Sequence, residues 1–210
     1  MSDKPADTTT STKPLVTIFE YYGAGASEVG DAIAQALGLP FHGQAFSSEA
    51  LEGGRGDATE EAAMLVQVFS VLGGAYGGFE GRDVVATQQQ KYDLVMQNNR
   101  QVWEFAREGG VIVGRNGAVV LADRPNTLHV LLTGAVEDRV RRAAQEAGIS
   151  REHAAGRQKR EDEVRAAMSL VLYGWDPRLP DRYDLVVNTS RISPAAAARA
   201  IVAVLASASS

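Results

Sequence analysis

The stretch "VTIFEYYGAGASEVGDAIAQALGLP", residues 16–40, constrains the fold most, because it passes from a strand through a glycine-rich turn into a helix. Residues 15–19 form an apolar, β-branched run that is typical of a buried strand. After the turn, apolar residues recur on one face with helical spacing, at Val29, Ile33, Ala36 and Leu37. Gly38 follows at a C-cap position. The stretch therefore predicts a strand–turn–helix unit.

The alternation of strand and helix continues along the rest of the chain. A long helix is predicted from residue 84 to 107, and the segments "VIVGRNG", "TLHVLLTG" and "YDLVVNTS" each contain a further strand. Helices are predicted in "AVEDRVRRAAQEAG", "SREHAAGRQKREDEVRAAMSLVLYG" and "SPAAAARAIVAVLAS". Strands that alternate with helices favour an α/β fold, in which helices cover both faces of a parallel sheet. With 210 residues, the chain suits one such domain.

Composition excludes several classes of protein. The absence of cysteine rules out disulfides, thiolate nucleophiles and zinc–thiolate sites. A net charge of −5 disfavours a nucleic acid as partner, and no apolar run is long enough to predict a membrane span. Residues 1–14 lack the apolar core of a signal peptide and are predicted to form a disordered tail. A cytoplasmic location is the resulting expectation.

The glycine-rich turn is a candidate phosphate site. In the P-loop pattern G-x-x-x-x-G-K-[ST], Glu20 takes the place of the first glycine, Gly25 the second, and Ala26 the place of the lysine. Ser27 takes the place of the hydroxyl that holds magnesium. The backbone amides expected to bind the phosphates belong to Gly23, Ala24, Gly25, Ala26 and Ser27. The alternative is that the glycines only permit a tight turn; a dinucleotide-binding pattern fits less well, because Glu28 replaces its last glycine.

Arginines gather in the second half of the chain. Arg115 follows a predicted strand at a glycine turn, and Arg139 and Arg142 share one face of a helix. Arg160 and Arg165 flank Asp162 in the next charged helix. A guanidinium is a permanent cation that binds phosphate oxygens in pairs, which suits phosphoryl transfer. The alternative is a solvated helix surface with ordinary ion pairs.

The segments "VIVGRNGAVVLADRPNTLHVLLTGAVEDRVRRA" and "KREDEVRAAMSLVLYGWDPRLPDRYDLVVNTSRIS" resemble the cytidylate-kinase-like family of P-loop nucleoside monophosphate kinases. The resemblance extends from residue 15 to about 205. It implies a P-loop kinase-type three-layer fold around a central five-stranded parallel sheet, in a single domain over residues 15–207. It also implies a nucleoside-monophosphate-binding insert at about 44–83 and a lid at about 150–175.

The resemblance assigns roles to the arginines. Arg115 would bind the acceptor phosphate, and Arg160, Asp162 and Arg165 would belong to the lid. Together with Arg139 and Arg142, the lid arginines would neutralise the transition state. The family commonly has basic residues at the places of Phe19 and Ser27 and an aspartate at the place of Gly43, so this chain departs from the family pattern at all three.

The expected function is therefore that of an ATP- and Mg²⁺-dependent phosphotransferase that resembles cytidylate kinase and phosphorylates a CMP-like acceptor. One alternative is a catalytically inactive nucleotide-binding or regulatory protein that works through partners. Another is a phosphotransferase for a different small molecule. The expected partner is a nucleotide or small-molecule substrate, with no nucleic acid and no membrane. The acceptor, the activity of a loop without lysine, and assembly into a homo-oligomer are left open.

Overall fold

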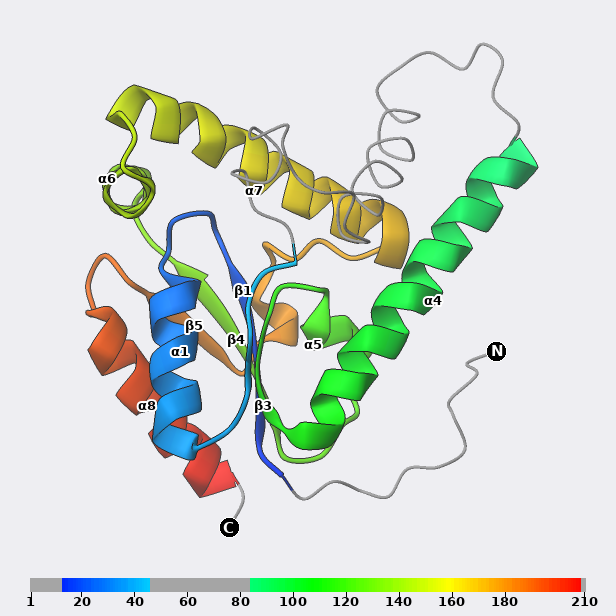
Figure 1. The fold of residues 1–210 in the computed structure, drawn as a ribbon, viewed down its shortest axis with the longest axis horizontal. Helices are drawn as coiled ribbons and strands as arrows, with labels where there is room; N and C mark the ends of the chain where they lie inside the picture. Colours follow the sequence, from blue (N-terminus) through cyan, green and yellow to red (C-terminus); the bar gives the residue numbers. More distant parts are fainter. Residues whose placement is uncertain (1–12, 46–83, 209–210) are drawn as a thin grey trace.

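The computed structural model describes residues 13–45 and 84–208 (Figure 1). Its centre is a five-stranded sheet in the order β2-β3-β1-β4-β5, in which every paired strand is parallel to its neighbour. The strands are β1 (Leu15–Glu20), β2 (Phe41–His42), β3 (Gly110–Val113), β4 (Thr127–Thr133) and β5 (Leu185–Asn188). The predicted α/β fold with a parallel five-stranded sheet is therefore confirmed.

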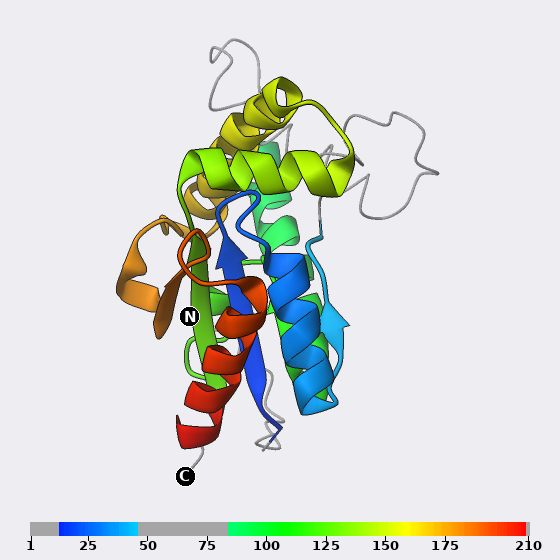
Figure 2. The same cartoon turned by 90° about the vertical axis from the view of Figure 1, so that its left-hand side faces the viewer.

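Helices cover both faces of this sheet and one of its ends. Helices α1 (Ala26–Leu37) and α8 (Pro194–Ala208) lie side by side on one face (Figures 1 and 2). The long helix α4 (Val84–Glu108) and the short α5 (Gly117–Val120) lie on the other. Helices α6 (Val136–Ala147) and α7 (Arg151–Tyr173) cross the carboxyl ends of the strands, and a short 3₁₀ helix, η1 (Pro180–Arg182), precedes β5 (Figure 2).

Alternating strand residues separate two hydrophobic cores. Val16 and Ile18 of β1 face α1 and α8, where they pack with Val29, Ile33 and Ile201. On the opposite face a second cluster packs β1 and β3 against α4 and the end of α5; it consists of Leu15, Val102, Ala106, Ile112 and Leu121. Because successive strand residues point to opposite faces, burial on both faces requires the apolar runs seen in the sequence.

Local signals end the helices where the sequence predicts. Gly38 closes α1 in the left-handed conformation, with φ 65°, which costs a glycine little. Ser150 caps α7 by accepting a hydrogen bond from the His153 amide, and Ser193 accepts one from the Ala196 amide at the start of α8. The segment predicted as a lid thus begins as a regular capped helix.

Two predicted segments fall largely outside the described residues. Residues 1–12 of the predicted tail and residues 46–83 of the predicted insert are not described, so both predictions stay predictions. In the part of the chain that is described, no helix is both long and apolar enough to cross a membrane.

Candidate functional site

The glycine-rich turn lies at the carboxyl end of β1, where that strand is flanked by β3 and β4. In open α/β sheets, ligands bind at the carboxyl ends of the strands. Gly23 and Gly25 adopt positive φ values of 78° and 90°, and the Ala24 amide donates to the Tyr21 carbonyl at 2.9 Å. Helix α1 starts directly after the turn, so its first amides and the positive end of its dipole face this edge.

A carboxylate of the chain already occupies the first amide of α1. Oε2 of Glu20 accepts a hydrogen bond from the Ala26 amide at 2.9 Å, while the N-cap residue Gly25 supplies no side-chain cap. Oε1 of Glu20 lies 3.5 Å from Nη1 of Arg165, and the two side chains are only 13% and 12% exposed. Glu20 therefore joins the start of α1 to a cation of α7.

Asp162 ties α7 to the glycine-rich turn. One of its oxygens accepts a hydrogen bond from the Tyr22 amide at 2.8 Å. The other accepts from Nη1 of Arg139 at 2.9 Å and from the Gln158 side chain at 2.6 Å. The carboxylate thus fixes the turn, α6 and α7 relative to one another.

Arg139 and Arg142 of α6 donate to carbonyl oxygens of the turn. Nη1 of Arg139 donates to the Tyr22 carbonyl at 3.0 Å, and its guanidinium lies 5.2 Å from the centre of the Tyr21 ring. Nη1 of Arg142 donates to the Gly23 carbonyl at 2.7 Å, and Nη2 donates to the Thr189 carbonyl at 3.0 Å. Both arginines lie at the turn, and both have protein partners there.

Helix α6 also explains why glycine is needed in the turn. A Cβ atom at Gly23 would lie 2.4 Å from the carbonyl oxygen of Arg139, and one at Gly25 would lie 3.4 Å from Cδ of Arg142. The alternative interpretation, that the glycines serve the path of the backbone, thus has a structural basis. It does not compete with phosphate binding, because the same packing brings two guanidinium groups to the turn.

A second strained segment follows β3, next to the turn. Gly114, Arg115 and Asn116 have positive φ values of 74°, 56° and 55° in succession. A side-chain-bearing residue adopts this conformation at a cost of about 1–3 kcal/mol, and such strain is frequent at functional sites. Nη1 of Arg115 donates to the Gln101 side chain, and its guanidinium lies 5.2 Å from the centre of the Phe105 ring.

The strained segment borders a small pocket. Its lining comes from β1, from the segment after β3, from α5 and from the loop after α7, and comprises Thr17, Ile18, Phe19, Gly114, Asn116, Gly117, Ala118 and Trp175. Oδ1 of Asn116 and Nε1 of Trp175 are buried and have no hydrogen-bond partner among the described residues. Such atoms are uncommon in folded proteins, so this donor and this acceptor call for a polar group that the described residues do not supply.

Burial sets the electrostatics of the side chains around these segments. The pKa of His42 is lowered by burial and by the nearby Arg115 charge, and its ring stacks on Phe105 with the centroids 3.8 Å apart. The pKa of Tyr21 is raised chiefly by burial, an effect that the charge of Arg178 opposes. At neutral pH both groups are therefore uncharged, which leaves the guanidinium groups as the cations of this region.

The structure separates the predicted site residues into three groups. Arg139, Arg142, Asp162 and Arg165 meet at the turn through the contacts above. Arg115 is half-buried and packs against Gln101 and Phe105 of α4, apart from the turn, and Arg160 is exposed on α7. In the turn, Ala24 and Ala26 have buried side chains and can offer only amides, whereas Ser27 is exposed. The described residues contain no cluster of three acidic or histidine side chains that could hold a metal.

The sequence patterns indicate neither Glu20 as part of this site nor the contact between Thr189 and Arg142. Glu20 stands out only as a departure from the first glycine of the P-loop pattern. The sequence feature that could have pointed to Glu20 is an acidic side chain directly before a glycine-rich turn that contains no charged residue. Thr189 gave no comparable signal, because its role depends on β5 lying next to β4, where its backbone carbonyl meets Arg142.

Comparison with known proteins places the chain among kinase-like sequences. A family model described as "Cytidylate kinase-like family" matches residues 15–191. A cytidylate kinase of Methanopyrus kandleri is 27% identical over 190 residues, which is 85% of this chain and 86% of that protein. A uronate isomerase of Corynebacterium glutamicum is 37% identical over 100 residues, which is 48% of this chain but 19% of that protein.

Solved structures support the fold. A crystal structure of an uncharacterized protein from Eubacterium ventriosum superposes with a TM-score of 0.64 at 16% identity, covering 93% of this chain and 99% of that one. This likeness concerns the fold alone.

Proposed function

Because the chain belongs to the cytidylate kinase-like family, we propose that it is a phosphotransferase that moves a phosphoryl group from ATP to a nucleoside monophosphate such as CMP. The observation that carries the proposal is the convergence of Arg139, Arg142 and Arg165 on a glycine-rich turn at a helix start. Cations and helix-start amides together are the groups that bind phosphates.

The donor triphosphate would bind at the turn. The amides of Gly23, Gly25, Ala26 and Ser27 would face it, whereas the Ala24 amide donates to the Tyr21 carbonyl. Glu20 supports this assignment, because the first amide of α1 donates a hydrogen bond to an anionic oxygen in this geometry. The exposed hydroxyl of Ser27 would contribute one ligand to Mg²⁺. One protein ligand is compatible with that ion, which commonly keeps waters and substrate phosphate oxygens around it and supplies charge neutralisation when bound.

The acceptor would bind at the segment after β3, which is a neighbour of β1 in the sheet. Arg115 is the proposed ligand of its phosphate. The small pocket beside it, about 10 Å³ in volume, has room for about one water molecule, which would link Nε1 of Trp175 and Oδ1 of Asn116 to a ligand bound outside it. The strained backbone of residues 114–116 would fix the direction of the Arg115 and Asn116 side chains.

Catalysis would depend on positioning and charge neutralisation. Phosphoryl transfer needs the attacking and leaving oxygens in line and the charge of the equatorial oxygens compensated. Arg165 and the exposed Arg160 would approach the transferred group from α7. Arg139, Arg142 and Asp162 would hold the turn in place, in addition to the charge compensation predicted for these arginines. An acceptor phosphate that is already ionised needs no general base.

A second candidate is a protein that binds nucleotide without turning it over. Two observations favour it: Ala26 stands at the place of the P-loop lysine, and the carboxylate of Glu20 occupies its amide. Removal of one preorganised donor commonly costs about 10²–10³ in rate. Such a protein would act through partners that recognise its nucleotide-bound form.

The test is a direct assay of turnover with a matched pair of variants on α7. The purified chain is incubated with ATP, CMP and Mg²⁺, and CDP and ADP are measured by chromatography. We expect CDP and ADP in equal amounts, a large loss of kcat in Arg165→Gln, and no loss in Arg151→Gln, whose side chain is exposed on the same helix. Saturable ATP binding without product would favour the second candidate.

A further inference from the structure

Glu20 raises a question that the proposed function does not answer. A phosphate donor would need the amide at the start of α1, yet the Glu20 carboxylate holds the Ala26 amide at 2.9 Å. A single N–H group makes one good hydrogen bond, and a carboxylate repels a phosphate at such a distance. The two anions therefore compete for one position.

The contact is built from several features of the chain. Gly25, the N-cap residue of α1, has no side chain with which to accept a bond from the helix, so the cap comes from Glu20, six positions before Ala26. The carboxylate is only 13% exposed. It therefore does not exchange freely with water at this amide.

The second oxygen of Glu20 gives the carboxylate an alternative partner. Its contact to Nη1 of Arg165 is 3.5 Å long, whereas its contact to the Ala26 amide is 2.9 Å. Arg165 is also held by Glu161 at 3.0 Å and lies 5.7 Å from the centre of the Tyr22 ring, so it stays next to the turn. Rotation of Glu20 toward Arg165 would free the amide while the carboxylate keeps a cation.

We propose that Glu20 is an internal anion that closes the phosphate position of the glycine-rich turn, so that a phosphate binds there only by displacing it. Glu20 then sets the affinity of the site for phosphates and favours ligands with enough charge to displace a carboxylate. A triphosphate meets this condition better than inorganic phosphate. This inference rests on the proposed function, because it assumes that the turn binds the donor.

The size of the effect follows from the fraction of molecules in which the amide is free. Apparent affinity falls in proportion to that fraction. If the carboxylate holds the amide in more than about nine molecules of ten, its removal should tighten phosphate binding about tenfold or more.

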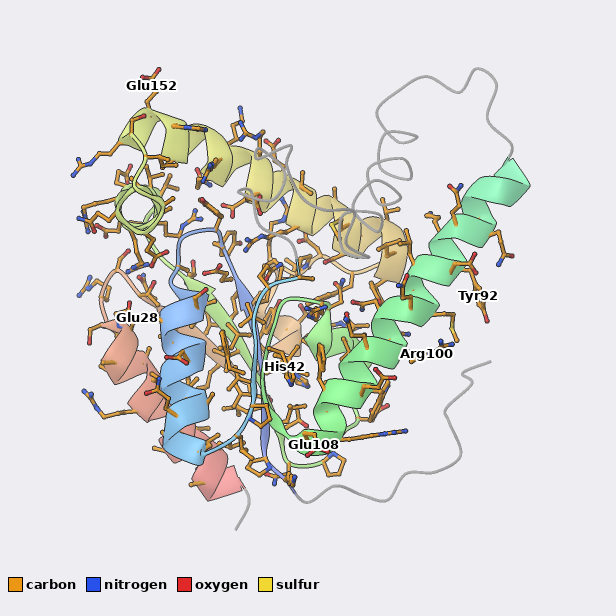
Figure 3. The ribbon with its side chains drawn as sticks, in the orientation of Figure 1. Glu28, His42, Tyr92, Arg100, Glu108 and Glu152 are labelled. Atoms are coloured by element: carbon orange, nitrogen blue, oxygen red, sulfur yellow. The ribbon has the colours of Figure 1, made fainter. Side chains whose placement is uncertain are left out.

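The experiment measures binding of inorganic tripolyphosphate, a probe without a nucleoside, by calorimetry. Glu20→Gln keeps the size of the side chain, so it should fold. It removes the charge that repels a phosphate and replaces the charge-assisted bond to the Ala26 amide by at most a weaker neutral one, which frees the amide in a larger fraction of molecules. Glu20→Ala removes the cap as well. The matched control is Glu28→Gln, which removes the same charge from an exposed side chain in the first turn of α1 (Figure 3).

We expect Glu20→Gln to bind tripolyphosphate about tenfold more tightly than the wild type, and Glu28→Gln to stay within about twofold of it. Glu20→Ala should also bind more tightly if it folds. Equal or weaker binding by Glu20→Gln would overturn the inference, as would a failure of both the wild type and Glu20→Gln to bind the probe.

The outcome is separable from that of the proposed function. If the wild type forms CDP while Glu20→Gln and the wild type bind tripolyphosphate equally, the inference fails and the proposed function stands. If Glu20→Gln tightens binding but neither protein forms CDP, the inference stands and the proposed function fails.

Discussion

Nη1 of Arg139 lies 2.9 Å from Oδ2 of Asp162, and the two side chains are only 5% and 15% exposed. The pair joins α6 to α7 directly above the glycine-rich turn, and each partner also holds a backbone group of Tyr22. Removal of either partner of such a largely buried ion pair is strongly destabilising, because the other partner is left as an uncompensated buried charge. Here the pair fixes the position of the turn.

Removal of Asp162 should therefore destabilise the fold. Asp162→Ala leaves the Arg139 charge and the Tyr22 amide without their carboxylate partner, and breaking a buried pair in this way costs about 3–5 kcal/mol. Urea denaturation measures the free energy of unfolding. Glu163→Ala, an exposed neighbour on α7, is the control and should cost less than about 1 kcal/mol. Similar losses in both variants would contradict the role assigned to Asp162.

Arg142 and Arg141 are adjacent on α6 but should respond differently to substitution. Arg142 donates to the carbonyls of Gly23 and Thr189, whereas Arg141 is exposed and pairs with Asp138. Arg142→Gln should lower the free energy of unfolding by about 1.5–3 kcal/mol, as expected for loss of hydrogen bonds to a charged group. It should also weaken ATP binding. Arg141→Gln should change stability by less than about 1 kcal/mol, and a larger effect than that of Arg142→Gln would refute this prediction.

Alanine substitutions at two glycines with positive φ values distinguish the cost of backbone strain from the cost of steric crowding. Gly38→Ala places a Cβ in open space at φ 65°, so only the left-handed conformation is penalised, by about 1–2 kcal/mol. Gly23→Ala adds a Cβ at 2.4 Å from the carbonyl oxygen of Arg139. We expect Gly23→Ala to be more destabilising than Gly38→Ala and to reduce nucleotide binding. Thermal unfolding checks the order, and equal shifts in Tm would show that α6 moves away without cost.

Stability should fall on acidification below pH 6.5. His129 is buried in β4, its Nδ1 lies 2.7 Å from Oγ1 of Thr17, and burial lowers its pKa despite the opposing charge of Asp184. Burial and Arg115 also lower the pKa of His42. As the pH falls, the unfolded chain therefore takes up protons at these histidines before the folded protein does. The stability that the neutral histidines contribute is fully present above pH 6.5 and is lost as the pH falls through their folded-state pKa.

The measurement is the free energy of unfolding between pH 8 and pH 5 in the wild type and in two variants. His129→Gln should have lower stability at every pH but a smaller decrease on acidification. The exposed His153→Gln should keep the decrease of the wild type. An unchanged pH dependence in His129→Gln would show that other groups account for it.

The arrangement of the elements was largely predictable, because it depends on local patterns. Apolar β-branched runs mark β1, β3 and β4, and Gly38 and Ser193 end or begin helices through interactions within a few residues. The long helix predicted from residue 84 to 107 corresponds to α4 (Val84–Glu108). Parallel pairing then follows, since a helix between two strands returns the chain to the end of the sheet at which the first strand began.

The sequence by itself determined the α/β fold and a glycine-rich turn with arginines late in the chain. Only the tertiary structure decided which groups those arginines contact. Arg139 and Arg142 meet carbonyls more than a hundred positions away, and Glu20 reaches both the start of α1 and Arg165. The spacing of residues along the chain determines which of them share a helix face. A hydrogen bond between distant segments also requires that their two elements pack at one particular distance and angle. Packing of the whole core sets that distance.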